Sequence, residues 1–174
     1  PFTNEWTIAS GKWTQRGKAP LPQKGKAYFF PSVAAHAEIF QDIDISNYSF
    51  VTDLGLMRMK YKAYMRAYPQ RPADQSFQVI EFRNANNTIV DSFKTAHYDS
   101  TRLWVSVSHH QVVPKGSRSI RVRLLSDRYN GSNNDGYHDE ILLTLSVSPW
   151  VYVLVFIILF VVLRFWFKKR RKQI

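Results

Sequence analysis

The stretch GLMRMKYKAYMRA, residues Gly55–Ala67, alternates two kinds of side chain over most of its length. One set of alternate positions holds Leu56, Arg58, Lys60 and Lys62, and the other holds Met57, Met59, Tyr61 and Ala63. Successive side chains of a β-strand point to opposite faces of its sheet, whereas a helix repeats about every 3.6 residues. The stretch therefore predicts a long strand that separates the two sets onto opposite faces.

The same period of two recurs on both sides of this stretch. The expected strands are Glu38–Ile45, Phe77–Arg83, Thr88–Phe93, Leu103–Ser108, Ser119–Leu125 and Ile141–Val147. The turn-prone residues Asn84–Asn87 predict a hairpin between two of them. The first thirty residues are rich in glycine and proline, which favours a long loop or short strands. About seven or eight short strands, with no convincing amphipathic helix, predict an all-β fold of the β-sandwich or jelly-roll type.

A different pattern ends the chain, where Trp150–Phe167 reads WVYVLVFIILFVVLRFWF and KKRRKQI follows. The run approaches the roughly 20 apolar residues that a helix needs to cross a bilayer, and it has no polar stripe. We expect residues 149–167 to form a transmembrane helix; a buried hairpin helix is the alternative. The expected anchor residues are aromatic and basic side chains: Trp150, Tyr152, Arg164, Trp166, Lys168, Lys169, Arg170, Arg171 and Lys172.

This segment also predicts how the chain is oriented. Basic residues mark the cytoplasmic side of a membrane helix, so residues 168–174 are expected to be a cytoplasmic tail and residues 1–148 an extracytoplasmic domain. The chain begins at Pro1 without a signal-peptide pattern, so a cleaved signal peptide is expected. The absence of cysteine excludes disulfides and thiolate sites. It favours a bacterial inner membrane with a periplasmic or cell-surface domain.

The formal charge of +11 is shared unequally between these parts. Residues 149–174 hold six of the 24 basic residues and none of the 13 acidic ones. Residues 1–148 therefore carry 18 basic and 13 acidic residues, a charge of +5. The basic tail suits an anionic lipid surface. It is too short to fold a nucleic-acid-binding face, so the expected partners are the bilayer and other membrane subunits, without nucleic acid.

The segment Val113–Leu145, VPKGSRSIRVRLLSDRYNGSNNDGYHDEILLTL, has a turn, a strand, an Asn/Gly-rich loop and a final strand. It resembles the C-terminal half of galactose-binding-like jelly-roll domains, the fold of many carbohydrate-binding modules in bacterial secreted and surface proteins. Phe40–Ile45 resembles an early strand of that family, Gly25–Phe30 the aromatic stretch before it, and Trp104 its central tryptophan. The resemblance implies a galactose-binding-like jelly roll. Its motifs are structural more than catalytic.

The stretch Asn134–Glu140 is the densest cluster of oxygen ligands in the sequence. Calcium takes six to eight oxygens, roughly 2.3–2.6 Å away, and such a loop supplies several. Many members of the resembled family carry a structural calcium, which implies Asp139 as a ligand. Asp135 would join it, with Glu38 or Asp42 on an early strand completing the site. The alternative is a turn whose Asn and Asp side chains cap their own backbone.

Catalytic motifs are missing from the sequence. It has no G-x-S-x-G, no Gly-rich phosphate loop and no H-E-x-x-H, so an enzyme is not expected. The short linker between the last strand and the membrane helix favours an accessory or scaffolding subunit docked onto a larger membrane complex. The alternative is a membrane-anchored, lectin-like module at the cell surface. Its expected ligand-binding residues are Tyr129, Asn134, Tyr137 and His138.

Overall fold

The computed structural model describes residues 5–151, 156–157, 159–161 and 163–164. Its strands are β1 (Thr7–Ser10), β2 (Thr14–Arg16), β3 (Tyr28–Phe30), β4 (His36–Asp44), β5 (Met57–Ala67), β6 (Gln75–Arg83), β7 (Ile89–Lys94), β8 (Val105–Val112), β9 (Ser119–Asp127) and β10 (Gly136–Val147). A 3₁₀ turn, η1 (Ser46–Tyr48), and a short helix, α1 (Ser49–Asp53), connect β4 to β5.

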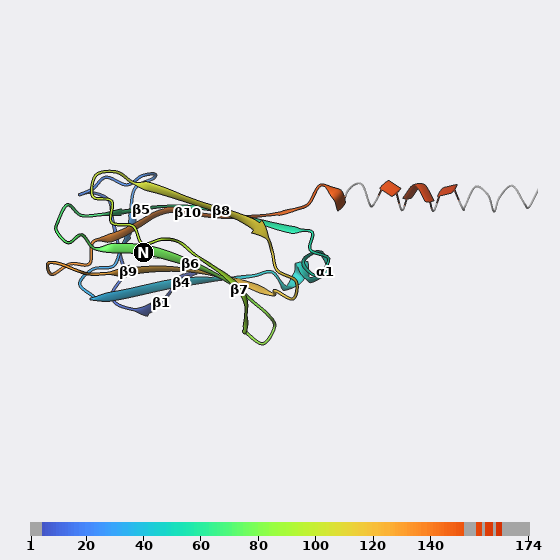
Figure 1. Cartoon of the computed structure of the whole chain (residues 1–174), viewed down its shortest axis with the longest axis horizontal. Coiled ribbons are helices and arrows are strands. Elements are labelled where there is room, and N and C mark those ends of the chain that lie inside the picture. The colour runs from blue at the N-terminus through green and yellow to red at the C-terminus, as the bar shows by residue number, and fades with distance from the viewer. Residues whose placement is uncertain (1–4, 152–155, 158, 162, 165–174) are drawn as a thin grey trace, which may run out of the picture.

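Two antiparallel five-stranded sheets stack face to face to form a β-sandwich (Figure 1). Sheet A has the order β1-β4-β9-β6-β7, and sheet B has the order β2-β3-β10-β5-β8. Strands that are neighbours in a sheet are mostly distant in sequence. For example, β10 lies between β3 and β5. The predicted all-β sandwich is confirmed.

Strand β5 shows how the alternation in the sequence builds the sandwich. Met57, Met59 and Tyr61 are buried between the sheets, whereas Arg58 and Lys60 are exposed on the outer face of sheet B. The inward side chains of both sheets form one core, which includes Trp13, Ile39, Met59, Met65, Ile80, Phe82, Ile120 and Leu124. Burying one large apolar side chain contributes about 1.5–3 kcal/mol to stability, so these positions hold the two sheets together.

A chain of buried hydrogen bonds crosses the core from one sheet to the other. The Tyr61 hydroxyl of sheet B donates to Gln78 Oε1 of sheet A over 2.9 Å. Gln78 Nε2 lies 3.2 Å from Nδ1 of His138, whose Nε2 lies 3.0 Å from the Leu125 carbonyl oxygen. These contacts suit a neutral imidazole that donates from Nε2 and accepts at Nδ1. Burial lowers the pKa of His138 from 6.5 to about 3.

The expected strands all appear, with differences at their ends. The largest concerns β10, which begins at Gly136 and not at Ile141, because Gly136–Asp139 pairs with Tyr64–Ala67 of β5. A register shift between Asp139 and Leu142 separates this part of β10 from the rest. The sequence predicts that the Asn/Gly-rich stretch is a loop. In the structure, its end forms a buried part of a strand. The first thirty residues form β1, β2 and β3, joined by loops.

The expected membrane helix finds no support in the structure. Within the described residues, no helix combines the length and apolar character needed to cross a bilayer. Trp150 is 68% exposed, and the Arg164 guanidinium carbon lies 5.6 Å from the centre of the Phe160 ring. The other expected anchor residues lie outside the described residues: Tyr152, Trp166, Lys168, Lys169, Arg170, Arg171 and Lys172. Membrane anchoring stays a prediction.

Candidate functional site

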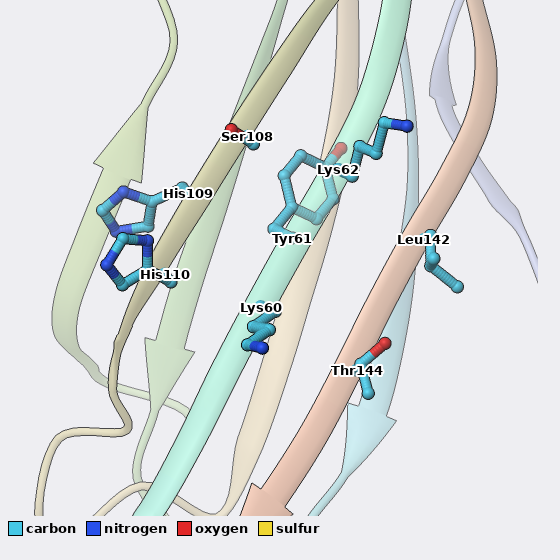
Figure 2. Close-up of a pocket in the computed structure, with 8 residues that line it drawn as sticks. All are labelled: Lys60, Tyr61, Lys62, Ser108, His109, His110, Leu142 and Thr144. Atoms are coloured by element: carbon cyan, nitrogen blue, oxygen red, sulfur yellow. The ribbon is translucent and has the colours of Figure 1, made fainter.

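The outer face of sheet B carries an open groove that crosses three neighbouring strands, β8, β5 and β10 (Figure 2). Its volume is about 300 Å³. The outward side chains that line it are Lys60, Lys62, Ser108, His110, Leu142 and Thr144. Strand pairing sets these side chains beside one another, because Lys60 is opposite His110 and Thr144, and Lys62 is opposite Ser108 and Leu142.

The groove combines apolar surface with hydrogen-bond donors and acceptors. Leu142 is 53% exposed and supplies apolar surface, and the hydroxyls of Ser108 and Thr144 can donate or accept hydrogen bonds. Tyr64 continues the row on β5, and the Lys62 ammonium lies 4.9 Å from the centre of its ring. The tyrosine phenol raises the pKa of Lys62, so this lysine is charged at neutral pH. A surface of this kind suits a polyhydroxylated ligand that also contacts apolar groups.

A second cluster, which we call the aromatic cluster, occupies the other half of the same face. It consists of Tyr28, Phe30, Tyr137 and Trp104. The rings of Tyr28 and Tyr137 lie 4.9 Å apart, and those of Tyr28 and Trp104 lie 5.5 Å apart. Such aromatic pairs stabilise a fold by about 0.5–1.5 kcal/mol beyond the area that they bury.

Residues 17–27, the strap, form the loop between β2 and β3 and cover the aromatic cluster. Trp104 donates its indole N–H to the Leu21 carbonyl oxygen over 2.9 Å. Asp139 Oδ2 accepts the backbone N–H groups of Gln23 and Lys24 over 2.6 and 3.2 Å. Tyr28 and Tyr137 are therefore at most 1% exposed, so these two rings offer no open surface to a ligand.

The sequence-predicted ligand residues do not share one surface. Tyr129 is 53% exposed in the loop after β9. Asn134, Tyr137 and His138 are all fully buried. Asn134 donates to the carbonyl oxygens of Ala34 and Ser126, and Tyr137 donates to Asp135 Oδ1 over 2.7 Å. Burial excludes a bound ligand from these three side chains in this conformation.

The four carboxylates of the expected calcium site lie in different surroundings. Glu38 and Asp42 of sheet A accept hydrogen bonds from Arg123 and Arg121. Asp135 and Asp139 lie on the sheet B side, where burial raises the pKa of both carboxyls. Among the described residues, no three His, Cys, Asp or Glu side chains form a group that could hold a metal. Calcium binding stays a prediction that the geometry of these carboxylates does not support.

None of the groove residues is among the ligand-binding residues expected from the sequence, although the sequence contains a pattern that points to some of them. The alternation in Gly55–Ala67 already separates the lysines of β5 from its core residues. It cannot show that β8 and β10 flank β5, because this pairing joins residues about 50 to 80 positions apart, such as Lys60 with His110 and Thr144. Only the sheet order turns an exposed strand face into a groove.

Comparison with known proteins identifies the fold of this chain but does not assign the chain to a family. No protein-family model matches the sequence, and no curated protein does. Solved structures do match. The enzymatically active domain of bacteriophage CBA120 tailspike protein 4 has a TM-score of 0.60 at 15% identity, over 82% of this chain and 20% of that one. A Clostridium thermocellum xylanase, with its CBM22-1 and GH10 modules, is matched over 26% of its own length. This chain thus spans about a fifth to a quarter of those two proteins.

Two similar structures are about as long as this β-sandwich. A family 16 carbohydrate binding module has a TM-score of 0.56 at 19% identity, over 80% of this chain and 89% of that one. The CBM22-1 xylan-binding domain of Paenibacillus barcinonensis Xyn10C has a TM-score of 0.51 at 18% identity, over 84% and 88%. At these identities the likeness shows the fold alone. It confirms the jelly-roll fold expected from the sequence.

Proposed function

We propose that the β-sandwich is a carbohydrate-binding module whose glycan lies in the groove of sheet B. The observation that carries the proposal is this groove, with hydroxyl, imidazole, ammonium and apolar groups on one open sheet face. The fold is shared with a carbohydrate binding module and with a xylan-binding domain, which favours a glycan as the ligand class. Of the two functions considered from sequence, the lectin-like alternative is the better supported.

We propose further that the module is not catalytic. Glycoside hydrolysis usually requires two carboxyl groups on either side of the scissile bond. The described residues that line the groove include neither Asp nor Glu. The lining groups can hold a sugar chain by hydrogen bonds and packing, but they provide no acid–base pair for this reaction.

Blocking the groove tests the proposal. Thr144 is exposed on the groove side of β10, so Thr144→Trp fills the groove without entering the core. In a glycan-array assay of the full chain, this variant is expected to lose at least about tenfold in affinity, equivalent to 1.4 kcal/mol. Thr88→Trp makes the same change in the exposed β6–β7 turn and should bind like the wild type. Equal binding by all three proteins, or no glycan binding at all, would contradict the proposal.

Docking to a membrane complex is a second proposed function, favoured by apolar side chains at one end of the sandwich. Phe50 and Leu54 are 75% and 52% exposed at α1, and Trp150 is 68% exposed. The Ser148 N–H donates to the Leu56 carbonyl oxygen over 2.7 Å, so the chain leaves β10 beside α1 (Figure 1). Apolar surface at this end suits contact with a bilayer or a membrane subunit. Purification of a lone monomer at native expression levels, in mild detergent, would argue against a complex.

A further inference from the structure

Four of the five outward positions of β5 from Arg58 to Arg66 hold cations, which we call the basic row: Arg58, Lys60, Lys62 and Arg66; the fifth position holds Tyr64. Alternate residues of a strand are about 7 Å apart, so the row extends over about 26 Å of the sheet B face. Lys60 and Lys62 lie in the groove itself, and Arg58 and Arg66 lie beyond its two ends along the strand.

Among the described residues, the basic row has no ion-pair partner. Within the described part of the chain, none of its four side chains has a carboxylate oxygen within 4.0 Å, the distance at which ion pairs form elsewhere in the molecule. The facing outward positions on β8 and in the groove part of β10 hold no carboxylate: Ser106, Ser108, His110, Val112, Leu142, Thr144 and Ser146. Glu140 acts on Lys62 only at longer range, and its own ion pair is with Lys24 at 3.0 Å.

The outer face of sheet A also carries cations, but the arginines on its strands β6 and β9 are each paired with a carboxylate. Arg121 pairs with Asp42 at 2.6 Å, and Arg123 pairs with Glu38 and with Glu81, both at 2.7 Å. Arg83 also pairs with Glu81. The two outer faces of one sandwich therefore differ in a specific way, since unpaired positive charge is concentrated on the face that carries the groove.

We propose that the glycan bound in the groove is acidic, a polysaccharide with carboxylate or sulfate groups along its chain; this inference rests on the proposed carbohydrate-binding function. Like charges at alternate positions of one strand repel each other, and anions spaced along a ligand relieve this repulsion. Ammonium and guanidinium groups also form stronger hydrogen bonds with anions than with neutral hydroxyls. The exposed hydroxyls beside the row are left to bind the sugar hydroxyls.

The test compares each acidic glycan with a neutral form of the same backbone. Suitable pairs are polygalacturonate with its methyl ester, glucuronoxylan with its carboxyl-reduced form, and heparin with its desulfated, N-acetylated and carboxyl-reduced form. Affinities of the full chain in non-ionic detergent are measured by calorimetry. For at least one pair, we expect the acidic form to bind at least about tenfold more tightly. The advantage should shrink as salt is added, because salt screens exposed charges.

Charge variants connect any such preference to the groove. Lys60→Gln with Lys62→Gln should remove most of the preference for the acidic form. Lys12→Gln with Lys94→Gln changes the net charge equally, at exposed positions on the β1–β2 turn and on β7 of sheet A, and should retain the preference.

The outcomes separate this inference from the function on which it rests. Binding of neutral and acidic forms with similar affinity, unchanged in the Lys60/Lys62 variant, overturns the acidic ligand and leaves the carbohydrate-binding module intact. The absence of binding to every glycan overturns both. If vesicles of phosphatidylglycerol bind more tightly than any acidic glycan, and the same two lysines are needed, then the row is a lipid-contacting face and the inference is wrong.

Discussion

At the scale of single residues, His138 shows why a side chain in a polar, turn-rich stretch of sequence can still be buried in the fold. The stretch Asn134–His138 is polar and rich in turn residues, which favours a ligand-binding loop. In the structure, pairing with β5 and the cover provided by the strap bury most of it. Both contacts come from parts of the chain more than 60 residues away. No local pattern contains them, so sequence alone could not place these side chains.

The buried imidazole predicts a specific loss of stability in acid. His138 has a pKa of about 3 in the folded protein, against 6.5 when exposed, so the unfolded state binds a proton first as the pH falls. The stability that the neutral imidazole contributes is fully present above pH 6.5 and is lost as the pH falls toward 3. At about pH 5 this group should lower the free energy of unfolding by about 2 kcal/mol relative to neutral pH.

Urea unfolding at about pH 7.5 and about pH 5 measures this effect. His138→Gln should be less stable than the wild type at neutral pH, and its stability should change less between the two pH values. His110→Gln alters an exposed histidine and should keep the wild-type pH dependence. If His138→Gln and the wild type lose the same free energy on acidification, the buried neutral imidazole is not the cause.

At the scale of elements, alternation was sufficient to find most strands but not to arrange them. Strand β9 begins at Ser119 as expected, and β5 ends at Ala67 as expected. Inward and outward side chains on β5 also follow the sequence pattern. The pairing of β5 with β8 and β10 could not be predicted, because many sheet orders satisfy the same alternation. Helix α1 is only five residues long, too short to show a helical period.

The strap gives a prediction at this scale. Asp139 accepts N–H groups from Gln23, Lys24 and Glu140, and hydrogen bonds to a carboxylate are worth about 1.5–3 kcal/mol. Asp139→Asn should therefore loosen the strap and speed trypsin cleavage after Lys18, Lys24 or Lys26 by about tenfold. Asp44→Asn removes a similar carboxylate from the Ser46 N–H and should leave these cleavage rates unchanged. Equal rates in the two variants would show that Asp139 does not hold the strap.

At the scale of the whole molecule, the sandwich gives one chain two outer faces of different character. Sheet A neutralises its arginines with Asp and Glu from neighbouring strands. Sheet B presents a groove with a row of cations that have no carboxylate partner among the described residues. Net charge cannot show this difference, since a charge of +5 on residues 1–148 does not say on which face it lies. The fold class could be predicted from sequence, whereas the location of the site required the stacking of both sheets.

The most direct test of this account is to map where a glycan binds. Amide chemical shifts of the full chain are followed while the tightest-binding glycan from the array is added. The largest changes are predicted at Lys60 and Lys62 of β5, at Ser108 and His110 of β8, and at Leu142 and Thr144 of β10. Changes confined to the loop around Tyr129, or to the outer face of sheet A, would contradict the groove of sheet B as the binding site.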